Sequence, residues 1–255
     1  MRAIAFANQK GGVGKTTTAV NTSVLLGRRG YRVLLIDLDP QGNTTSSLGI
    51  DKANLDGTVY DIILDDAPMS GAILPSVRPN VDLLPTTPAL AAAEVDLVSV
   101  ADREHQLKRS LSGATETYDL AIIDCPPSLG LLTINGLTAA DHVVIPIQCE
   151  FLALEGVSQL ITTIDLVKRR LNPDLDLLGV LMTMFDARTN LSTSVVEEVR
   201  RFFPDRIFTT IIPRSVRLAE APSFGQSIAE YDPSSRGGLA YEAFAAELIE
   251  RLGLR

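Results

Sequence analysis

Residues 9–18 read Gln9-Lys10-Gly11-Gly12-Val13-Gly14-Lys15-Thr16-Thr17-Thr18. They follow an apolar run over residues 3–7 and precede a helical pattern that continues through Leu25. This order of strand, glycine-rich loop and helix is typical of a phosphate-binding loop. Glycines let the backbone turn tightly, so that its N–H groups converge on phosphate oxygens beside the positively polarised amino end of the helix. The stretch therefore predicts a nucleotide-binding protein.

Two side chains of this loop have expected roles in ATP chemistry. Lys15 should reach the β- and γ-phosphates, and the Thr16 hydroxyl should ligate Mg²⁺. The other nucleotide-binding residues that we expect in the loop are Lys10, Gly11, Gly12, Val13, Gly14 and Thr17. The expected ligands are therefore ATP or ADP together with Mg²⁺.

The loop departs from the ordinary G-x-x-x-x-G-K-[ST] pattern at its start. Gln9 stands where a glycine is usual, and a second lysine, Lys10, follows it. This arrangement resembles the deviant loop K-G-G-x-G-K-[ST] of a family of dimerising ATPases. The resemblance implies that Lys10 crosses to the partner subunit and contacts the phosphates of its nucleotide.

Apolar runs alternate with helical patterns along the chain, and this alternation predicts an α/β fold. The expected strands cover residues 3–7, 33–36, 81–84, 120–123, 142–147, 177–182 and 207–212. The expected helices cover residues 16–29, 88–99, 103–114, 130–138, 151–171, 190–202 and 236–252. The apolar runs are continuous, which indicates a sheet buried on both faces. We predict a P-loop NTPase fold with a mostly parallel twisted sheet and helices on both faces.

The chain is expected to form a single domain over residues 1–255, without an N-terminal DNA-binding domain. Its 255 residues, 45% of them hydrophobic, suffice for one large α/β domain. The segment 51–79, interrupted by Asp65-Asp66-Ala67-Pro68, is expected to be a surface excursion between strands. The amino terminus runs directly into the first strand, so we expect no signal peptide. No apolar stretch approaches the roughly 20 residues of a membrane span.

The two cysteines, Cys125 and Cys149, exclude a disulfide scaffold and a C-x-x-C metal site. Both lie in apolar, strand-like surroundings, so we expect buried free thiols. A cluster ligand set at a dimer axis, as in nitrogenase iron protein, is the alternative.

Charge is distributed unevenly along the chain. The formal net charge is −8, which argues against nucleic-acid binding by the whole surface. Residues 188–217, however, contain six arginines and three acidic residues, a local net charge of +3, so the remainder carries −11. A local basic surface is therefore expected in the carboxyl-terminal half.

Aspartates follow two of the predicted strands, at the ends where ligands bind in sheets of this kind. Asp37-Leu38-Asp39-Pro40 follows the run 33–36. We expect the two aspartates to have different roles and assign Asp39 to hold the attacking water or to contact Mg²⁺-bound water. For Asp37, capping of the strand and turn is the simpler interpretation.

The second such aspartate is Asp124, which follows the apolar run 120–123 in the layout of a Walker B motif. Its carboxylate should face the P-loop threonine, Thr16, and hold Mg²⁺ through water. Pro126 and Pro127 constrain the chain directly afterwards, which suggests a loop that senses the γ-phosphate.

Taken together, these motifs resemble those of the ParA/Soj family of chromosome and plasmid partition ATPases, within the deviant-Walker group that includes MinD. The match covers nearly the whole chain. The matching blocks are residues 8–18, 37–43, 124–128, 146–150, 153–156, 183–189 and 212–223.

The resemblance implies an ATP-sandwich homodimer and slow hydrolysis stimulated by a DNA-bound ParB/Spo0J-type partner. It implies that Pro213 and Ser215 edge the adenine pocket, although many relatives have asparagine at the position of Ser215. It further implies that the ATP-bound dimer binds double-stranded DNA without sequence preference through Arg188 and Arg217. The protein is then expected in the cytoplasm, associated with the nucleoid when ATP is bound.

Three other functions are compatible with the loop. A MinD-like membrane-cycling ATPase would need a basic amphipathic tail, whereas residues 241–252 carry three glutamates and one arginine. We therefore expect the tail to pack on the sheet, and no membrane partner. A ligase such as the cobyrinate amidating enzymes would need a further substrate site. A ParA-like positioner of another cargo would share all these motifs.

Overall fold

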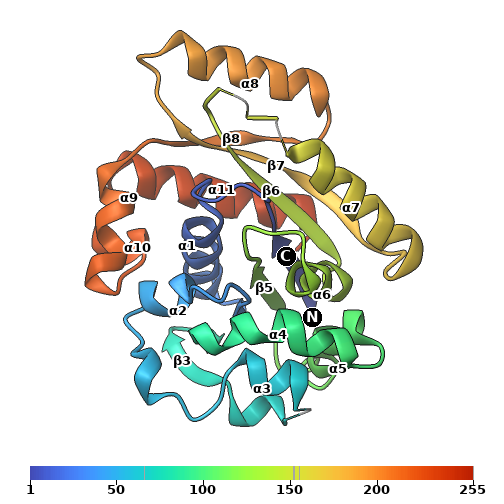
Figure 1. Cartoon of the computed structure of the whole chain (residues 1–255). Coiled ribbons are helices and arrows are strands. Elements are labelled where there is room, and N and C mark those ends of the chain that lie inside the picture. The colour runs from blue at the N-terminus through green and yellow to red at the C-terminus, as the bar shows by residue number, and fades with distance from the viewer. Residues whose placement is uncertain (66, 152, 155, 255) are drawn as a thin grey trace.

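The computed structural model describes residues 1–65, 67–151, 153–154 and 156–254. Asp66 and Glu155, which belong to two of the motifs named above, lie outside the described residues. In the described part of the chain, eight strands form one sheet (Figure 1). The strands are β1 (Arg2–Phe6), β2 (Val33–Asp37), β3 (Leu74–Arg78), β4 (Val81–Leu84), β5 (Leu120–Asp124), β6 (His142–Gln148), β7 (Asp176–Phe185) and β8 (Ile207–Pro213).

The strand order is β3-β4-β2-β5-β1-β6-β7-β8. Every neighbouring pair is parallel except β3 and β4, which are antiparallel. The register places both Phe6 of β1 and Asp37 of β2 opposite Asp124 of β5. The carboxyl ends of these three strands therefore meet at one edge of the sheet. The prediction of a mostly parallel α/β sheet is confirmed.

Helices cover both faces of the sheet (Figure 1). The α-helices are α1 (Lys15–Arg28), α2 (Asn43–Ser47), α3 (Val59–Leu64), α4 (Ala93–Asp96), α5 (Gln106–Ser112), α6 (Leu131–Ala139), α7 (Val157–Arg170), α8 (Asn190–Phe202), α9 (Val216–Glu220), α10 (Ile228–Tyr231) and α11 (Arg236–Leu252). Short 3₁₀ helices are η1 (Lys52–Asn54), η2 (Met69–Gly71), η3 (Pro88–Ala92), η4 (Leu97–Ser99), η5 (Arg103–His105) and η6 (Ala221–Phe224).

Successive residues of β1 point into two different hydrophobic cores. Ala3 and Ala5 join the core under α3 to α8, whereas Ile4 and Phe6 join the core under α1, α10 and α11. This alternation follows from the pleat of a strand, and burial on both sides explains why the run is apolar throughout. The two cores hold the sheet rigid beneath the loops at its carboxyl edge.

Helix α11 contributes its apolar side to the second core. Tyr241, Phe244, Leu248 and Leu252 are all buried there. The expectation that the tail packs on the sheet is thus confirmed. None of the described helices combines the length and the hydropathy that crossing a bilayer would require.

The seven predicted strands are all present, but the predicted helices differ in three places. The expected helix 103–114 is divided into η5 and α5. The expected helix 88–99 is divided into η3, α4 and η4. The expected helix 151–171 begins only at Val157, because Gly156 before it has a left-handed φ of 79°. Such a backbone conformation cannot continue a right-handed helix.

The segment 51–79 contains more structure than the sequence predicted. Thr58 and Asp61 form a capping box that starts α3. Strand β3 pairs with β4 at the edge of the sheet, with a register shift between Leu74 and Arg78. Pro75 is tolerated there because an edge strand has one row of backbone groups without a ladder partner, and Ser76 adopts a φ of 53°.

The packing of α1 on β4 gives a test of the fold. A Cβ at Gly27 would lie 2.5 Å from the Pro79 carbonyl oxygen and 2.6 Å from Val81 Cγ2. Overpacking of this kind costs about 1–3 kcal/mol, more than the gain of about 1 kcal/mol in helix propensity. We expect Gly27→Ala to lower the free energy of unfolding by about 1–2 kcal/mol in a urea titration. Gly71→Ala, which meets no atom within 4 Å, is the matched control, and equal stability of both variants would contradict the packing described here.

Candidate nucleotide-binding site

The loop between β1 and α1 has the backbone of a phosphate-binding loop. Gly12 and Gly14 adopt φ values of 75° and 89°, a region that L side chains rarely enter. Gly14 is the residue before α1, and no side chain caps this end of the helix. The first N–H groups of α1 can therefore face an anion, assisted by the helix dipole.

Lys15 is the first residue of α1 and is only 6% exposed. Its Nζ donates a hydrogen bond to the carbonyl oxygen of Lys10 at 3.2 Å. Burial lowers the pKa of Lys15, while the carboxylates of Asp124 and Asp39 oppose this shift. The ammonium is thus held within the loop, close to acidic groups that favour its charged form.

Asp124, at the end of β5, receives two hydroxyl groups on one oxygen. Thr16 Oγ1 and Thr44 Oγ1 each donate a hydrogen bond to Asp124 Oδ2 at 2.7 Å. Burial raises the pKa of Asp124 to about 6, although the two hydroxyls oppose this shift. The predicted pair of Thr16 and Asp124 is thereby brought into contact.

The second oxygen of Asp124 is a candidate acceptor at the expected Mg²⁺ site. Asp124 Oδ1 is buried and has no hydrogen-bond partner in the described part of the chain. Mg²⁺ in nucleotide sites usually keeps several waters and binds one or two carboxylate or hydroxyl oxygens. A buried acceptor oxygen beside the Thr16 hydroxyl fits such a water-ligated ion.

Asp37 and Asp39 have different environments, as expected. Asp37 is fully buried, and its Oδ2 accepts hydrogen bonds from the backbone N and Oγ1 of Thr45 at 2.8 and 2.7 Å. Burial, and to a smaller extent Asp124, raises the pKa of Asp37 to about 7. Asp39 Oδ1 accepts a hydrogen bond from the Gln41 backbone N at 2.9 Å. Asp37 therefore holds the start of α2, while Asp39 lies in the loop before it.

Lys10 contacts an acidic residue of its own chain. Its Nζ lies 2.5 Å from Glu150 Oε1, and both side chains are 38% exposed. The Lys10 backbone N donates to Asn8 Oδ1 at 3.0 Å, which holds the entrance of the loop. Lys10 is not among the residues that line the phosphate cavity described next.

Two adjoining cavities lie at the carboxyl edge of the sheet. One of about 380 Å³ is lined by Gly11, Gly12, Gly14, Lys15, Thr16, Thr17, Asp39, Gln41, Asn43, Ser47, Pro127 and Met184. The other, of about 220 Å³, is lined by Gly14, Thr17, Thr183, Met184, Ile212, Pro213, Arg214, Ser215, Leu218, Ala219 and Tyr241. The first carries the predicted phosphate-binding residues, and the second carries Pro213 and Ser215 with mostly apolar neighbours. Val13 lies beneath the loop, where its carbonyl oxygen accepts a hydrogen bond from Thr183 Oγ1 at 2.8 Å.

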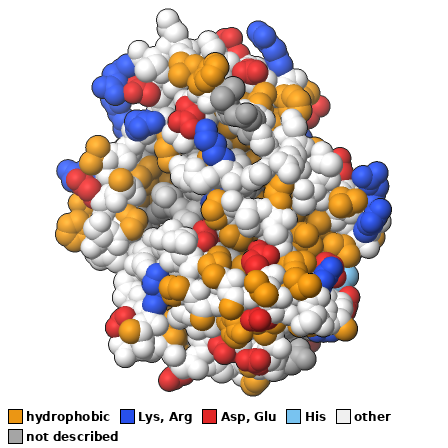
Figure 2. Space-filling model, in the orientation of Figure 1, with side chains coloured by type: hydrophobic (Ala, Val, Ile, Leu, Met, Phe, Trp, Pro, Cys, Tyr) orange, Lys and Arg blue, Asp and Glu red, His pale blue; other side chains and the backbone are white. Residues whose placement is uncertain are grey.

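The two arginines predicted to contact DNA are both exposed, and both form ion pairs within the chain. Arg188 is paired with Asp186 through two hydrogen bonds, of 2.9 and 2.7 Å. Arg217 lies 2.9 Å from Glu220 and 3.5 Å from Asp232. In Figure 2, Lys and Arg side chains gather over the upper part of the molecule, near α8 and α9, with Asp and Glu beside them. The basic surface is therefore partly neutralised.

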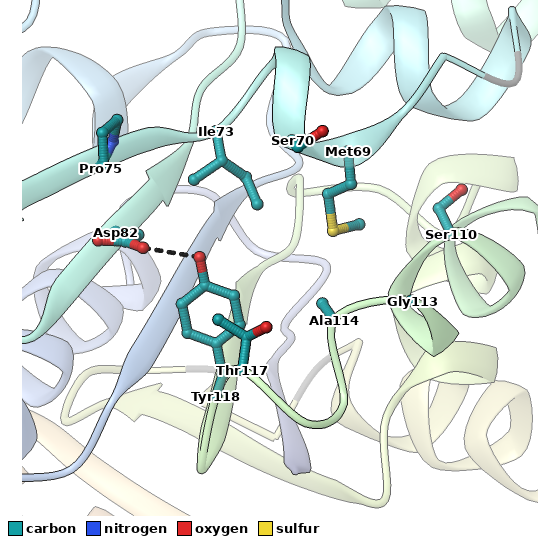
Figure 3. A pocket seen from close by; sticks show the side chains of 10 residues that line it. All are labelled: Met69, Ser70, Ile73, Pro75, Asp82, Ser110, Gly113, Ala114, Thr117 and Tyr118. Atoms are coloured by element: carbon teal, nitrogen blue, oxygen red, sulfur yellow. Dashed lines mark hydrogen bonds between the residues drawn. The ribbon is translucent and has the colours of Figure 1, made fainter.

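A larger cavity, of about 520 Å³, lies apart from these residues, beside Tyr118 (Figure 3). The Tyr118 hydroxyl donates a hydrogen bond to Asp82 Oδ2 at 2.7 Å, and the Ser76 backbone N donates to Asp82 Oδ1 at the same distance. The described residues that line it include neither lysine nor arginine. This cavity is therefore unsuited to a triphosphate, and none of the predicted site residues lines it.

Sequence reasoning missed three contacts of the nucleotide site. Thr44 bonds to Asp124, Thr183 bonds to the P-loop backbone, and Glu150 binds Lys10. Thr44 lies in α2, after the loop that follows β2, and Thr183 lies in β7 directly after the apolar run 177–182, so polar residues after the apolar runs are the signal that could have found them. Glu150 lies 140 residues from Lys10, and no local pattern joins the two.

Comparison with known proteins places the chain among close relatives. A family profile described as an AAA domain matches residues 1–177. Sporulation initiation inhibitor protein Soj of Bacillus subtilis is 56% identical over 96% of this chain and 97% of its own length. Chromosome partitioning protein ParA of Myxococcus xanthus is 52% identical over 98% of this chain and 88% of its own length.

A solved structure with bound nucleotide has the same fold. It is named cobyrinic acid a,c-diamide synthase of Mycobacterium smegmatis, and it contains ADP and magnesium. Its sequence is 42% identical to this chain, and the aligned region covers 99% of this chain and 96% of the M. smegmatis chain. The two structures superpose with a TM-score of 0.87. The same protein was also solved with an ATP analogue and magnesium.

The buried carboxyl of Asp37 predicts a pH-dependent stability in the absence of nucleotide. In the unfolded chain this group ionises near pH 4, whereas in the folded protein its pKa is about 7. Between these values the folded state binds more protons, so the free energy of unfolding falls as pH rises from 4 to 7. We expect Asp37→Asn to reduce this fall by on the order of 3 kcal/mol in urea titrations at several pH values. Asp56→Asn, at an exposed position, should keep the wild-type slope. Parallel curves for wild type and Asp37→Asn would contradict the assignment.

Proposed function

Because the chain belongs to the ParA/Soj family of partition ATPases, we propose that it hydrolyses ATP to time its own binding to DNA. In this proposal, ATP joins two copies of the chain into a dimer with the nucleotides at the interface. The dimer binds double-stranded DNA without sequence preference, and a ParB/Spo0J-type partner stimulates hydrolysis, which releases the subunits. The protein then alternates between cytoplasm and nucleoid while a chromosome or plasmid is segregated.

One observation carries this proposal: the residues that ATP chemistry requires converge on one cavity at the carboxyl edge of the sheet. Lys15, Thr16 and Asp39 line it, and Thr16 is bonded to Asp124. A lysine that the ordinary P-loop lacks stands at the entrance of the same loop. This combination supports ATP hydrolysis at an interface between two subunits rather than nucleotide binding without hydrolysis.

The proposed mechanism assigns each residue one task. Lys15 and the loop N–H groups bind the phosphates, and Asp39 orients the attacking water by accepting its hydrogen bond. Thr16 and Asp124 would hold Mg²⁺, which neutralises phosphate charge when it is bound. Lys10 of the partner subunit neutralises the charge that develops on the transferred phosphoryl group.

In this scheme the Lys10 ammonium leaves Glu150 of its own chain and contacts the triphosphate bound to the partner subunit. In the single chain its ammonium lies against Glu150, with both side chains partly in water. Exposed ion pairs of this kind contribute only about 0–1 kcal/mol, so a triphosphate across the interface can replace the carboxylate at small cost. Glu150 thus keeps Lys10 near the loop entrance until the dimer forms.

The decisive experiment is DNA binding measured with ATP, with ADP and without nucleotide. We expect tight DNA binding with ATP but not with ADP or without nucleotide, because only the dimer presents two basic surfaces at once.

Two variants test the residue roles in this cycle. Lys10→Ala should abolish the ATP dependence of DNA binding and should reduce the affinity for ATP much less than it reduces dimerisation. Asp39→Ala should remain on DNA with ATP because hydrolysis is blocked. Equal DNA binding in all three nucleotide states would refute the proposed cycle, and normal hydrolysis by Asp39→Ala would refute the role of that residue.

The name of the M. smegmatis structure makes ATP-dependent amide synthesis a second candidate. Both functions would use the same phosphate cavity, so they differ in what stimulates turnover. A partition ATPase responds to DNA and its partner protein, whereas an amide synthase requires a carboxylic acid and an ammonia donor. ATP hydrolysis measured with each addition separates the two candidates.

The basic surface gives a further prediction. Arg188→Ala and Arg217→Ala should each weaken DNA binding. Each should also make the slope of log K for DNA binding against log salt concentration shallower by about 0.9, the value for one lost phosphate contact. ATP-dependent dimerisation should persist in both variants. Arg206→Ala is the control, because Arg206 lies at the amino end of β8, whereas Arg217 follows its carboxyl end, and Arg206 is likewise paired with an aspartate, Asp176. Salt titrations of DNA binding check this, and unchanged slopes in the first two variants would remove these arginines from the interface.

A further inference from the structure

Helix α6 begins directly after the loop 125–130, which follows Asp124. The residue before the helix is Gly130, so the helix has no side-chain cap of its own. The cap comes instead from Glu94 of α4. The Leu131 backbone N donates to Glu94 Oε2 at 2.8 Å, and the Leu132 backbone N donates to Glu94 Oε1 at 3.3 Å.

A carboxylate in this position satisfies two N–H groups that the helix leaves without partners. Its negative charge also lies at the positive end of the helix dipole. Gly130 is matched to this contact, because a Cβ there would overlap the Glu94 carboxylate. A residue without a Cβ at this position therefore lets the carboxylate lie directly against the start of α6.

The loop 125–130 connects this capped end to the phosphate cavity. Asp124 at one end of the loop holds the hydroxyls of Thr16 and Thr44, and Pro127 within the loop lines the phosphate cavity. At the other end, Thr133 Oγ1 donates to the Ser128 carbonyl oxygen at 2.8 Å. The position of Pro127 therefore depends on the anchors at both ends.

We propose that Glu94 is a positioning residue for ATP hydrolysis: by capping α6 it sets where the loop 125–130 stands beside the γ-phosphate. This inference rests on the proposed ATPase function. Glu94 lies outside both nucleotide cavities, so its loss should disturb the alignment needed for the reaction and leave ATP binding intact.

The test compares Glu94→Ala and Glu94→Gln with a matched control, Glu247→Ala. Glu247 also accepts two backbone N–H groups, from Thr209 and Thr210 at 2.8 and 2.9 Å, but it does so on α11 and β8. Each variant is measured for kcat, for ATP affinity, for thermal unfolding, and for hydrogen exchange of the peptides that cover residues 125–132.

We expect Glu94→Ala to lower kcat by about ten- to a hundredfold, because small displacements of reacting groups have effects of that size, with ATP affinity changed by about twofold at most. Exchange over residues 125–132 should become faster. Glu94→Gln can still accept one N–H group and should recover part of kcat. Glu247→Ala should lower the melting temperature and leave kcat and the exchange of residues 125–132 unchanged.

The outcomes separate this inference from the function on which it rests. A wild-type chain that does not hydrolyse ATP would overturn both. An active wild type with an equal kcat in Glu94→Ala would overturn only the role of Glu94. A kcat loss of the same size in Glu247→Ala would show that the effect follows general stability, and would overturn it as well.

Discussion

The nucleotide site depends on one constraint: a buried ammonium and several buried carboxylates at the carboxyl edge of the sheet must all be paired or hydrogen-bonded. Lys15 lies near Asp39 and Asp124, and Asp37 is fully buried beside them. Removing charged groups from water is costly unless they are paired or hydrogen-bonded. Threonine hydroxyls therefore surround the carboxylates, and the start of α2 is held in place by the same bonds. A triphosphate with its metal ion would bring charges of both signs to a site that is already arranged for them.

Most of the fold could be predicted from the sequence because a parallel sheet covered on both faces demands continuous apolar strands. The runs at residues 33–36 and 120–123 are such strands, and their ends place Asp37 and Asp124 side by side. Strand β3 escaped prediction because it lies at an edge, where Pro75 and partly exposed side chains interrupt the pattern. The division of residues 88–99 into short helices also has no periodic signal, since Glu94 there serves another helix.

The candidate site was predictable where its residues lie close in sequence, and only in part elsewhere. The loop around Lys15 carries its own pattern, whereas the contacts of Lys10 with Glu150 and of Arg217 with Asp232 join distant segments. Local patterns cannot show that a cation has an acidic neighbour in the folded chain. The arginines expected to contact DNA are paired in the structure, Arg188 with a carboxylate two residues away and Arg217 with one near and one more distant carboxylate, so a phosphate backbone must compete with those groups.

Both edge strands of the sheet carry features that hinder the pairing of a further strand. At one edge, the proline, the left-handed Ser76 and the register shift of β3 interrupt the row of backbone groups. At the other, Glu247 occupies the N–H groups of Thr209 and Thr210, and Arg251 donates to the Ile207 carbonyl oxygen. Among the described residues, both edge strands therefore offer only an interrupted row of backbone groups to an incoming strand. Copies of this chain at high local concentration therefore carry less of the aggregation risk that an open sheet edge brings.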